Sequence, residues 1–162
     1  MLIGVLSDTH IPYRSKRLPE FVLNQLKGVD LILHAGDWQT LEVYDLLSKI
    51  APVEGVAGNT DGVEVVQRLG WKKIIEAGPY RIGLVHGHGG ERSKTVDRAL
   101  KTFAHERVDM IIFGHSHIPY LEERKGIILF NPGSPTDKRR QPKYSFGLVQ
   151  ITNQIVAKHI YF

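Results

Sequence analysis

Two hydrophobic patterns alternate over the first 60 residues of the chain. Three short, almost continuous apolar runs predict buried parallel strands, at residues 2–6, 31–33 and 53–57. Between these runs, apolar residues recur at the three- and four-residue spacing of a helix that buries one face. They are Leu18, Val22 and Leu26 in the first segment, and Val43, Leu47 and Ile50 in the second. Thr40 is the expected N-cap of the second helix, and Gly28 follows the end of the first.

The second half of the chain has a different pattern. Short apolar runs predict three more strands, at residues 74–75, 82–85 and 111–113. Gly78 and Pro79 indicate a turn between the first two, and one amphipathic helix is expected at about residues 92–106. From Tyr120 onward the chain has strand patterns only. Alternating strands and helices followed by a β-rich C-terminal tail predict an α/β sandwich with mixed sheets, built as a single domain over residues 1–162.

Composition narrows the chemistry that is available. The chain has 162 residues, eight histidines and no cysteine. A chain of this length buries enough apolar surface to fold without a disulfide or a structural metal. The absence of cysteine excludes disulfide scaffolds, thiolate nucleophiles, zinc sites with cysteine ligands and iron–sulfur clusters. Any metal site must therefore use imidazole nitrogen and oxygen ligands.

The net charge of +4 is concentrated in one segment. Residues 137–143 contain four basic residues and one acidic residue, so they carry +3 of that total. The rest of the chain is nearly neutral, which gives no indication of a nucleic-acid-binding surface. No apolar run reaches the ~18–20 residues of a membrane helix. The apolar N-terminal segment lacks the basic residues that begin a secretory signal, so we expect a cytoplasmic protein.

Polar residues follow five of the predicted strands at the point where each strand ends. Ligands of open α/β sheets bind at this edge, so these residues are candidates for one shared site. They are Asp8-Thr9-His10, Gly36-Asp37, Gly58-Asn59-Thr60-Asp61, His86-Gly87-His88 and Gly114-His115-Ser116-His117.

The spacing within these segments suits metal binding. In an extended segment, residues i and i+2 project to the same side, so Asp8 with His10, and His115 with His117, are each expected to present two ligands to one site. Imidazole with oxygen donors suits manganese, iron, nickel, zinc or cobalt. Two such ions about 3.5–4 Å apart stabilise the attacking and leaving oxygens of a displacement at phosphorus.

Each motif alone also has an ordinary structural explanation. The Asp-x-His, Gly-Asp and Asn-Thr-Asp-Gly sequences all occur in turns that hold no ligand. The pairs His86/His88 and His115/His117 are harder to explain by packing, because closely spaced imidazoles are rarely needed in a core. The five segments together therefore predict a binuclear metal site.

The same segments resemble, in order, the five motifs of the calcineurin-like metallophosphoesterases. The matching residues are Asp8-x-His10, Gly36-Asp37, Gly58-Asn59-x-Asp61, His86 and Gly114-His115-x-His117. The chain as a whole is most similar to the small single-domain phosphodiesterase branch of bacteria and archaea. This resemblance implies a two-sheet β sandwich flanked by helices, in agreement with the pattern-based prediction.

The resemblance also implies a role for each ligand. One metal ion would be held by Asp8, His10 and His117. A second ion would be held by Asn59, His86 and His115. Asp37 would bridge the two ions, and Asn59 would also contact the substrate. The family hydrolyses phosphoesters with a water or hydroxide activated by two divalent ions, without a phosphoenzyme intermediate. We expect Mn²⁺ first, with Ni²⁺, Mg²⁺, Fe²⁺, Zn²⁺ or Co²⁺ as alternatives.

One position departs from the motif of many relatives. They carry a His between the residues equivalent to Asn59 and Asp61, which contacts the phosphate or protonates the leaving group, whereas this chain has Thr60. A hydroxyl does not act as a general acid near pH 7. We predict that His88 takes over part of this catalytic role. The alternative is that His88 orients the phosphate or supports the ligands.

Two later segments are weaker candidates for the site. Residues 131–135, Asn-Pro-Gly-Ser-Pro, resemble a loop of the same branch that lines the site with backbone N–H groups, although a rigid turn explains them equally well. The basic residues 138–140 would steer a phosphorylated substrate toward the metals, or belong to a solvated loop.

The predicted function is therefore hydrolysis of phosphodiesters by a metal-dependent phosphoesterase. The expected partner is a small phosphorylated substrate, nucleotide derivatives included, and apolar edge strands leave a homodimer or larger homo-oligomer open. The alternatives are a phosphomonoesterase or nucleotidase, and a non-catalytic metal-binding scaffold that resembles the metallophosphoesterase-like subunit of retromer. A scaffold is disfavoured because all seven ligand positions carry Asp, His or Asn.

Overall fold

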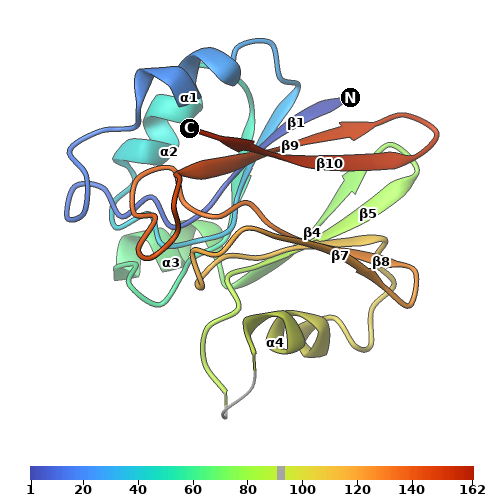
Figure 1. Cartoon of the computed structure of the whole chain (residues 1–162). Helices are drawn as coiled ribbons and strands as arrows, with labels where there is room; N and C mark the ends of the chain where they lie inside the picture. The colour runs from blue at the N-terminus through green and yellow to red at the C-terminus, as the bar shows by residue number, and fades with distance from the viewer. Residues whose placement is uncertain (91–93) are drawn as a thin grey trace.

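The computed structural model describes residues 1–90 and 94–162 of the chain. In this part of the chain, two five-stranded sheets are stacked on each other, and helices cover the two outer faces (Figure 1). The α/β sandwich of two mixed sheets flanked by helices is therefore confirmed.

The first sheet has the strand order β10-β9-β1-β2-β3. Its strands are β1 (Leu2–Leu6), β2 (Leu31–His34), β3 (Val53–Gly55), β9 (Ser145–Ile151) and β10 (Ile155–Tyr161). β1, β2 and β3 run parallel, and β9 pairs antiparallel with both β1 and β10. Within this sheet, each of the three parallel strands carries a candidate ligand segment at its carboxyl end.

The second sheet has the strand order β4-β5-β6-β8-β7. Its strands are β4 (Lys72–Ala77), β5 (Tyr80–Val85), β6 (Met110–Ile112), β7 (Tyr120–Arg124) and β8 (Ile127–Asn131). β5, β6 and β8 are parallel, and β4 and β7 are antiparallel strands at the two edges. The predicted β-rich tail from Tyr120 onward is confirmed, since β7 to β10 follow one another without a helix.

Three apolar layers fill the structure. The helices α1 (Glu20–Gln25), α2 (Glu42–Leu47) and α3 (Val63–Leu69) pack on the first sheet, and α4 (Thr95–Thr102) packs on the second. Along β1, Ile3 and Val5 face the second sheet, whereas Leu6 faces the helices. Because both faces of the parallel strands are buried, their sequences are continuous apolar runs rather than alternating ones.

The helix predictions need three corrections. Helix α3 was not predicted: its buried Val65 and Leu69 have the four-residue spacing of a helix, but the segment is only seven residues long and its β-branched valines favour a strand. Thr40 precedes the N-cap position of α2, which Leu41 occupies, although the Thr40 hydroxyl accepts the N–H of Glu42 at 3.4 Å. The helix predicted at residues 92–106 ends at Thr102, where the hydrogen bonds change to the tighter i to i+3 pattern. Its first two predicted residues lie outside the described part of the chain.

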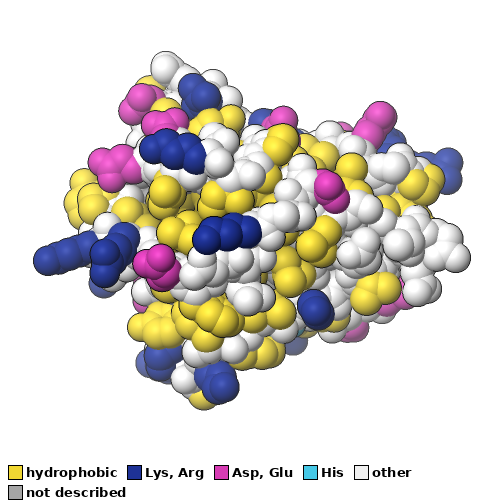
Figure 2. Space-filling model, turned by 90° about the horizontal axis from the view of Figure 1, so that it is seen from above, with side chains coloured by type: hydrophobic (Ala, Val, Ile, Leu, Met, Phe, Trp, Pro, Cys, Tyr) yellow, Lys and Arg dark blue, Asp and Glu magenta, His cyan; other side chains and the backbone are white. Residues whose placement is uncertain are grey.

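The outer surface carries both apolar and charged side chains. In the view of Figure 2, apolar side chains form a broken band across the face, and Lys and Arg side chains lie among them as well as at the edges. The homo-oligomer expected from apolar edge strands stays a prediction. Among the described residues, no helix has the length and apolar character needed to cross a membrane.

His34, at the end of β2, is a buried polar residue that connects two ligand segments. Its Nδ1 accepts the N–H of Gly36 at 3.2 Å, and its Nε2 lies 3.1 Å from the Thr9 hydroxyl oxygen. The ring stacks on Trp38 with a centroid distance of 3.6 Å. Burial holds the pKa of His34 well below its usual value. The neutral form is therefore the one that fits the segments around Asp8 and Asp37.

Replacing His34 by Gln should weaken the pH dependence of stability. In the unfolded state His34 binds a proton below about pH 6.5, whereas the folded state excludes it, so stability is lost as the pH falls below that value. Between pH 6.5 and 5, the free energy of unfolding of the wild type should fall faster than that of His34→Gln, by up to about 1.4 kcal/mol per pH unit. Urea titrations with a chelator at each pH measure this difference. Parallel curves would contradict the prediction.

Candidate metal centre

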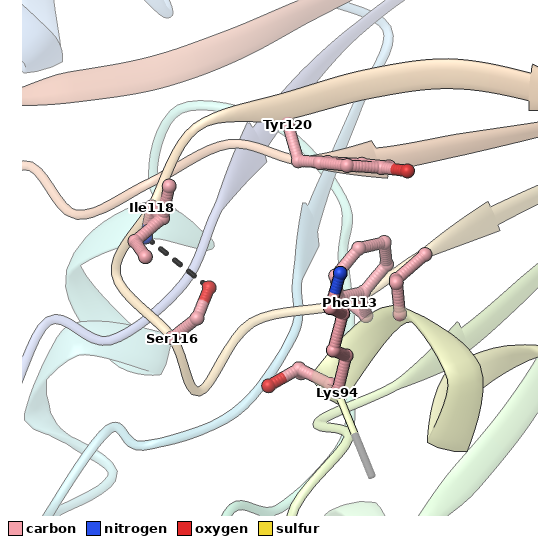
Figure 3. Close-up of a pocket in the computed structure, with 7 residues that line it drawn as sticks. Lys94, Phe113, Ser116, Ile118 and Tyr120 are labelled. Atoms are coloured by element: carbon pink, nitrogen blue, oxygen red, sulfur yellow. Dashed lines mark hydrogen bonds between the residues drawn. The ribbon is translucent and has the colours of Figure 1, made fainter.

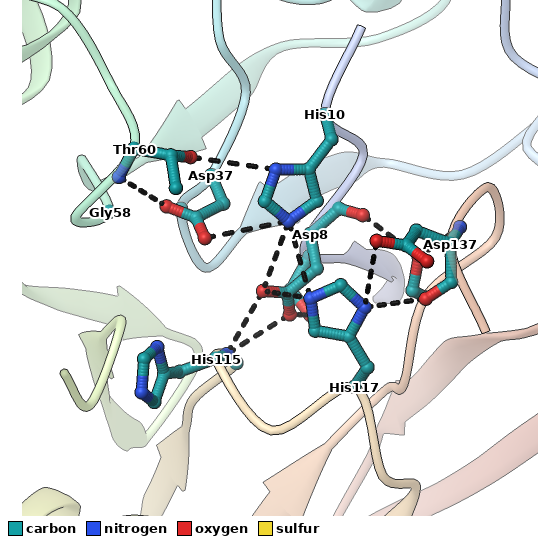
Figure 4. Close-up of polar contacts among 12 residues, drawn as sticks. Asp8, His10, Asp37, Gly58, Thr60, His115, His117 and Asp137 are labelled. Carbon is teal, nitrogen blue, oxygen red and sulfur yellow. Dashed lines mark hydrogen bonds and ion pairs between the residues drawn. The ribbon is translucent and has the colours of Figure 1, made fainter. Parts of the chain in front are cut away.

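The candidate ligands meet where the parallel strands of both sheets end. Asp8 follows β1, Asp37 follows β2, Asn59 follows β3, and His86 follows β5. His115 follows β6, and its N–H donates to both carboxylate oxygens of Asp8 across the two sheets, at 3.1 and 3.0 Å. Figure 4 shows Asp8, Asp37 and the imidazoles of His10 and His117 around a common centre. The ends of five strands thus build one site.

Two groups of ligand atoms occupy this centre. Asp8, His10 and His117 form one group, and Asp37, His86 and His115 form the other; within each group the candidate ligand atoms lie within 4.8 Å of one another. All six residues except His115 are buried.

The distances within and between the groups are short. In the first group, the Nε2 atoms of His10 and His117 are 3.2 Å apart, and His117 Nε2 lies 3.3 Å from Asp8 Oδ1. In the second group, His86 Nε2 lies 3.2 Å from Asp37 Oδ2. The same Asp37 oxygen lies 3.5 Å from His10 Nε2, so this carboxylate stands between the groups.

Asn59 belongs to the second group. Its side-chain oxygen lies 3.2 Å from His86 Nε2 and 3.0 Å from His115 Nδ1. All seven residues that the sequence identified as ligand candidates are therefore brought together.

The backbone around the ligands differs from the extended geometry expected from the sequence. Asp8, His10, Asp37, His115 and His117 all have positive φ, between 46° and 69°. Non-glycine residues rarely adopt this conformation, and several together at one site are typical of a functional centre. As a result, His115 and His117 point to different groups. Both still lie in the one site that their spacing predicted, and the groups they join are those that the family resemblance implied, whereas Asp8 and His10 lie in the same group.

The tautomers of two imidazoles indicate what the centre can bind. His86 Nδ1 lies 2.7 Å from the carbonyl oxygen of Ala35, and His117 Nδ1 lies within hydrogen-bonding distance of the carbonyl oxygen of Asp137. Carbonyl oxygens only accept, so each Nδ1 carries the hydrogen and each neutral ring presents an Nε2 lone pair. These lone pairs face the carboxylate oxygens of Asp8 and Asp37. Acceptors that face each other need a cation between them. Between His86 and Asp37 a proton can fill this place, because the Asp37 carboxylate raises the pKa of His86 despite its burial, and a metal ion would replace that proton. The donor set fits divalent metal ions.

The pKa shifts follow from burial and from the charges of the ligands. Burial raises the pKa of Asp8 to about 7, although nearby His86 opposes the shift. Burial acts in the same direction on Asp37, but hydrogen bonds from His86 and Thr60 outweigh it and hold its pKa well below the usual range. Burial lowers the pKa of His115 and of His117 to about 4. At neutral pH these two rings are therefore unprotonated and available as ligands.

Asp61 holds the loops beneath the second group. Its carboxylate accepts the backbone N–H groups of Asp37 at 3.0 Å, Gly58 at 2.7 Å and Gln39 at 2.7 Å. The N–H of Thr60 in turn donates to Asp37 Oδ1 at 3.0 Å. Asp61 was visible in the sequence as part of a motif, but its role in positioning the backbone was not. Nothing in the sequence identified Gln39.

The 131–137 segment forms hydrogen bonds that hold Asp8 and His117 in place. Ser134 Oγ donates to the carbonyl oxygen of Asp8 at 2.8 Å, and the carbonyl of Asp137 receives His117 Nδ1–H. Ser7 Oγ lies 2.7 Å from Asp8 Oδ2 and 2.9 Å from the carbonyl oxygen of Gly133. The predicted site loop at 131–135 therefore contacts the ligand segments through the Ser134 hydroxyl and the Asn131 side-chain amide, which donates to the carbonyl of Gly114 at 2.8 Å, rather than through the expected backbone N–H groups.

His88 lies beside the second group without belonging to it. Its ring centroid is 5.4 Å from that of His86 and 6.4 Å from that of His115, and the half-exposed Trp71 covers it at 5.3 Å. Its Nδ1 is buried and has no hydrogen-bond partner in the described part of the chain.

An apolar cavity of about 310 Å³ lies behind the His115–His117 segment (Figure 3). Ser116 lines it from between the two ligands, and Thr95 lines it from the start of α4. Its apolar lining residues are Val96, Phe113, Ile118 and Tyr120. The cavity therefore shares a wall with the metal centre.

Comparisons with known proteins agree with this geometry. A model of the calcineurin-like phosphoesterase superfamily domain matches residues 1–154. A probable metallophosphoesterase of Methanothermobacter thermautotrophicus is 41% identical over 143 residues, which cover 86% of this chain and 80% of the relative.

Two solved structures represent the neighbours in fold. Vps29 of Entamoeba histolytica, solved with zinc, has a TM-score of 0.76 and 28% identity, and the similarity covers 99% of both chains. A structure described as a novel archaeal phosphodiesterase has a TM-score of 0.74 and 22% identity, over 100% of both chains, and it supports the fold alone. The family match and the ligand geometry together lead to one conclusion: this chain belongs to the calcineurin-like phosphoesterase superfamily, the metallophosphoesterases.

Proposed function

We propose that the protein hydrolyses phosphodiesters at a binuclear metal centre, with Mn²⁺ as the first candidate for both ions. The observation that carries the proposal is the convergence of seven side chains, each of which can present a lone pair to the same space. Asp8, His10 and His117 would hold one ion, and Asn59, His86 and His115 the other. Asp37 would bridge them, since its Oδ2 lies within 3.5 Å of imidazole nitrogens from both groups.

The two ions supply Lewis acidity and lower the pKa of water, so that a nucleophile forms near neutral pH. The chain itself supplies the geometry and the charge. Only Asp8 and Asp37 among the seven ligands are carboxylates, so two divalent ions leave a local charge of about +2 that attracts a phosphate. Asn59, whose side-chain oxygen lies near the rings of both His86 and His115, would also orient a phosphate oxygen.

The apolar cavity favours a diester over a monoester. A phosphodiester carries two alcohol groups, and one of them stays on the phosphate through the reaction. The cavity behind His115 and His117, with the rings of Phe113 and Tyr120 in its wall, is suited to an aromatic or aliphatic alcohol group. A monoester has no such group to place there.

We also propose a cytoplasmic location for this activity, from the sequence pattern alone.

The competing reading is a scaffold that keeps the fold as a binding surface. The Vps29 structures are as similar to this chain as the phosphodiesterase is, so the fold does not separate the two. The ligand set does favour an enzyme. The strained backbone at five of the ligands has a cost of about 1–3 kcal/mol each, which a protein without a metal-dependent activity has no reason to retain.

The direct test is an assay of metal-stripped protein that is refilled with Mn²⁺, Ni²⁺, Mg²⁺ or Zn²⁺. We expect bis-p-nitrophenyl phosphate to be hydrolysed, and p-nitrophenyl phosphate to be hydrolysed at least about tenfold more slowly in kcat/KM. Phenyl p-nitrophenyl phosphate should be preferred over methyl p-nitrophenyl phosphate, because only the phenyl group fills the cavity. Hydrolysis of the monoester alone would indicate a monoesterase, and no hydrolysis with any ion would favour the scaffold.

The variant Asp37→Ala tests the bridging ligand. It should lose at least one of two bound ions and more than about 100-fold in kcat, since even groups that only support metal ligands are worth 10–100-fold. The apolar layers do not involve Asp37, so the thermal unfolding of the chelated protein should stay cooperative. Metal content by mass spectrometry and kcat are measured beside Asp45→Ala, an exposed carboxylate on α2. Two ions and normal turnover in Asp37→Ala would refute the assignment.

His88 is proposed as the residue that acts on the leaving group. The variant His88→Ala should lower kcat by about 10²-fold for a diester with an alkyl leaving group, which needs a proton. The loss should be much smaller for p-nitrophenolate, which leaves without one. His105→Ala, an exposed change after α4, is the control. If both substrates lose activity equally, His88 orients the phosphate instead, and unchanged turnover of both at saturating metal would remove it from the site.

A further inference from the structure

Gln39 is a half-buried residue held in an unusual backbone conformation beside the first ligand group. Its φ is +83°, which is rare for a residue with a long side chain. Two contacts keep it there: its N–H donates to Asp61 Oδ1 at 2.7 Å, and the segment around it forms an isolated parallel bridge with Ile11. The conformation directs the side-chain amide toward His10.

One atom of the Gln39 side-chain amide contacts two neighbouring groups. This atom, Nε2, lies 2.9 Å from His10 Nδ1 and 2.8 Å from the Thr60 hydroxyl oxygen. A half-turn about the last side-chain bond exchanges Nε2 and Oε1 without changing the shape of the group. In one orientation the amide donates to both neighbours, and in the other it accepts from both.

The two orientations select different tautomers of His10. When the amide donates, Nδ1 of His10 must accept, so the ring hydrogen is on Nε2. There it points into the space that His117 Nε2 and Asp37 Oδ2 also face. When the amide accepts, the hydrogen is on Nδ1 and Nε2 presents a lone pair to the same space. Only the second form can bind a metal ion through Nε2. The imidazole is neutral in both, so the exchange moves one proton through solvent with no change of charge.

We propose that Gln39 is a positioning residue that selects the metal-binding tautomer of His10, with its Oε1 turned toward Nδ1 whenever an ion is bound. This inference rests on the metal centre proposed above. His86 and His117 need no such residue, because backbone carbonyls hold their Nδ1–H groups permanently. His10 is therefore the one ligand imidazole of the first group whose tautomer depends on a side chain.

Thr60 completes the arrangement. Its hydroxyl both donates and accepts, so it satisfies the Gln39 amide in either orientation. A carboxylate in place of Thr60 would stabilise only the donating orientation of the amide. The Thr60 side chain thus contacts the amide that positions His10, and its hydroxyl oxygen lies 3.5 Å from His10 Nδ1.

The test compares Gln39→Leu, which removes the acceptor, with Gln39→Glu, which keeps an oxygen that accepts from Nδ1–H. Zn²⁺ binding to the stripped proteins is measured by calorimetry, and the His10 tautomer of the zinc-loaded proteins by long-range ¹H–¹⁵N NMR correlations. Gln67→Leu, an exposed glutamine on α3, is the control. We expect Gln39→Leu to weaken one of the two binding steps by about 10–100-fold, and Gln39→Glu to stay within about threefold of the wild type. The NMR spectrum of the wild type should show the hydrogen of His10 on Nδ1.

Three results would overturn the inference: wild-type affinity in Gln39→Leu, equal losses in the Leu and Glu variants, or a hydrogen on Nε2 of His10 in the zinc-loaded protein. Each of them leaves the proposed function intact if the wild type binds two ions and hydrolyses diesters. Failure of the wild type to bind any ion would refute both, so the two kinds of failure are distinguishable.

Discussion

The centre depends on one constraint, which is that Asp8 is a fully buried carboxylate at the contact between the two sheets. Its backbone N–H donates to the carbonyl oxygen of Gly36, which follows β2, and its side-chain oxygens accept the backbone N–H of His115, which follows β6. Its carbonyl accepts the hydroxyl of Ser134 from the segment after β8. A carboxylate in this position has a high cost unless it is hydrogen-bonded and paired with positive charge. The same residue therefore joins the sheets and creates the need for a cation.

The ligand segments contain glycines because they approach the ligand side chains closely. A Cβ on Gly58 would lie 2.1 Å from Asp37 Oδ1, and a Cβ on Gly114 would lie 2.8 Å from Asp8 Oδ2. Gly36 has φ +96°, and a Cβ there would lie 2.8 Å from His86 Nδ1. These positions need glycine because the ligand loops pack directly against carboxylates and imidazoles. The Gly-Asp, Gly-Asn and Gly-His pairs of the sequence are thus packing requirements as well as turns.

Most of the fold and the membership of the site could be predicted from the sequence. Continuous apolar runs identify parallel strands that are buried on both faces, and polar residues after those runs converge because parallel strands end at one edge. The division of His115 and His117 between the groups could not be derived from spacing, because it depends on positive φ at both residues. The role of Gln39 was also out of reach. It depends on a backbone conformation imposed by Asp61, a residue 22 positions away in the sequence.

Anomalous diffraction from crystals soaked in Mn²⁺ would show how many ions the protein binds and where they lie. We expect two peaks about 3.5–4 Å apart, on either side of the Asp37 carboxylate. One peak should contact Nε2 of His10 and of His117, and the other should contact His86 Nε2 and the side-chain oxygen of Asn59. A single peak, or peaks that lie away from Asp8 and Asp37, would contradict this expectation.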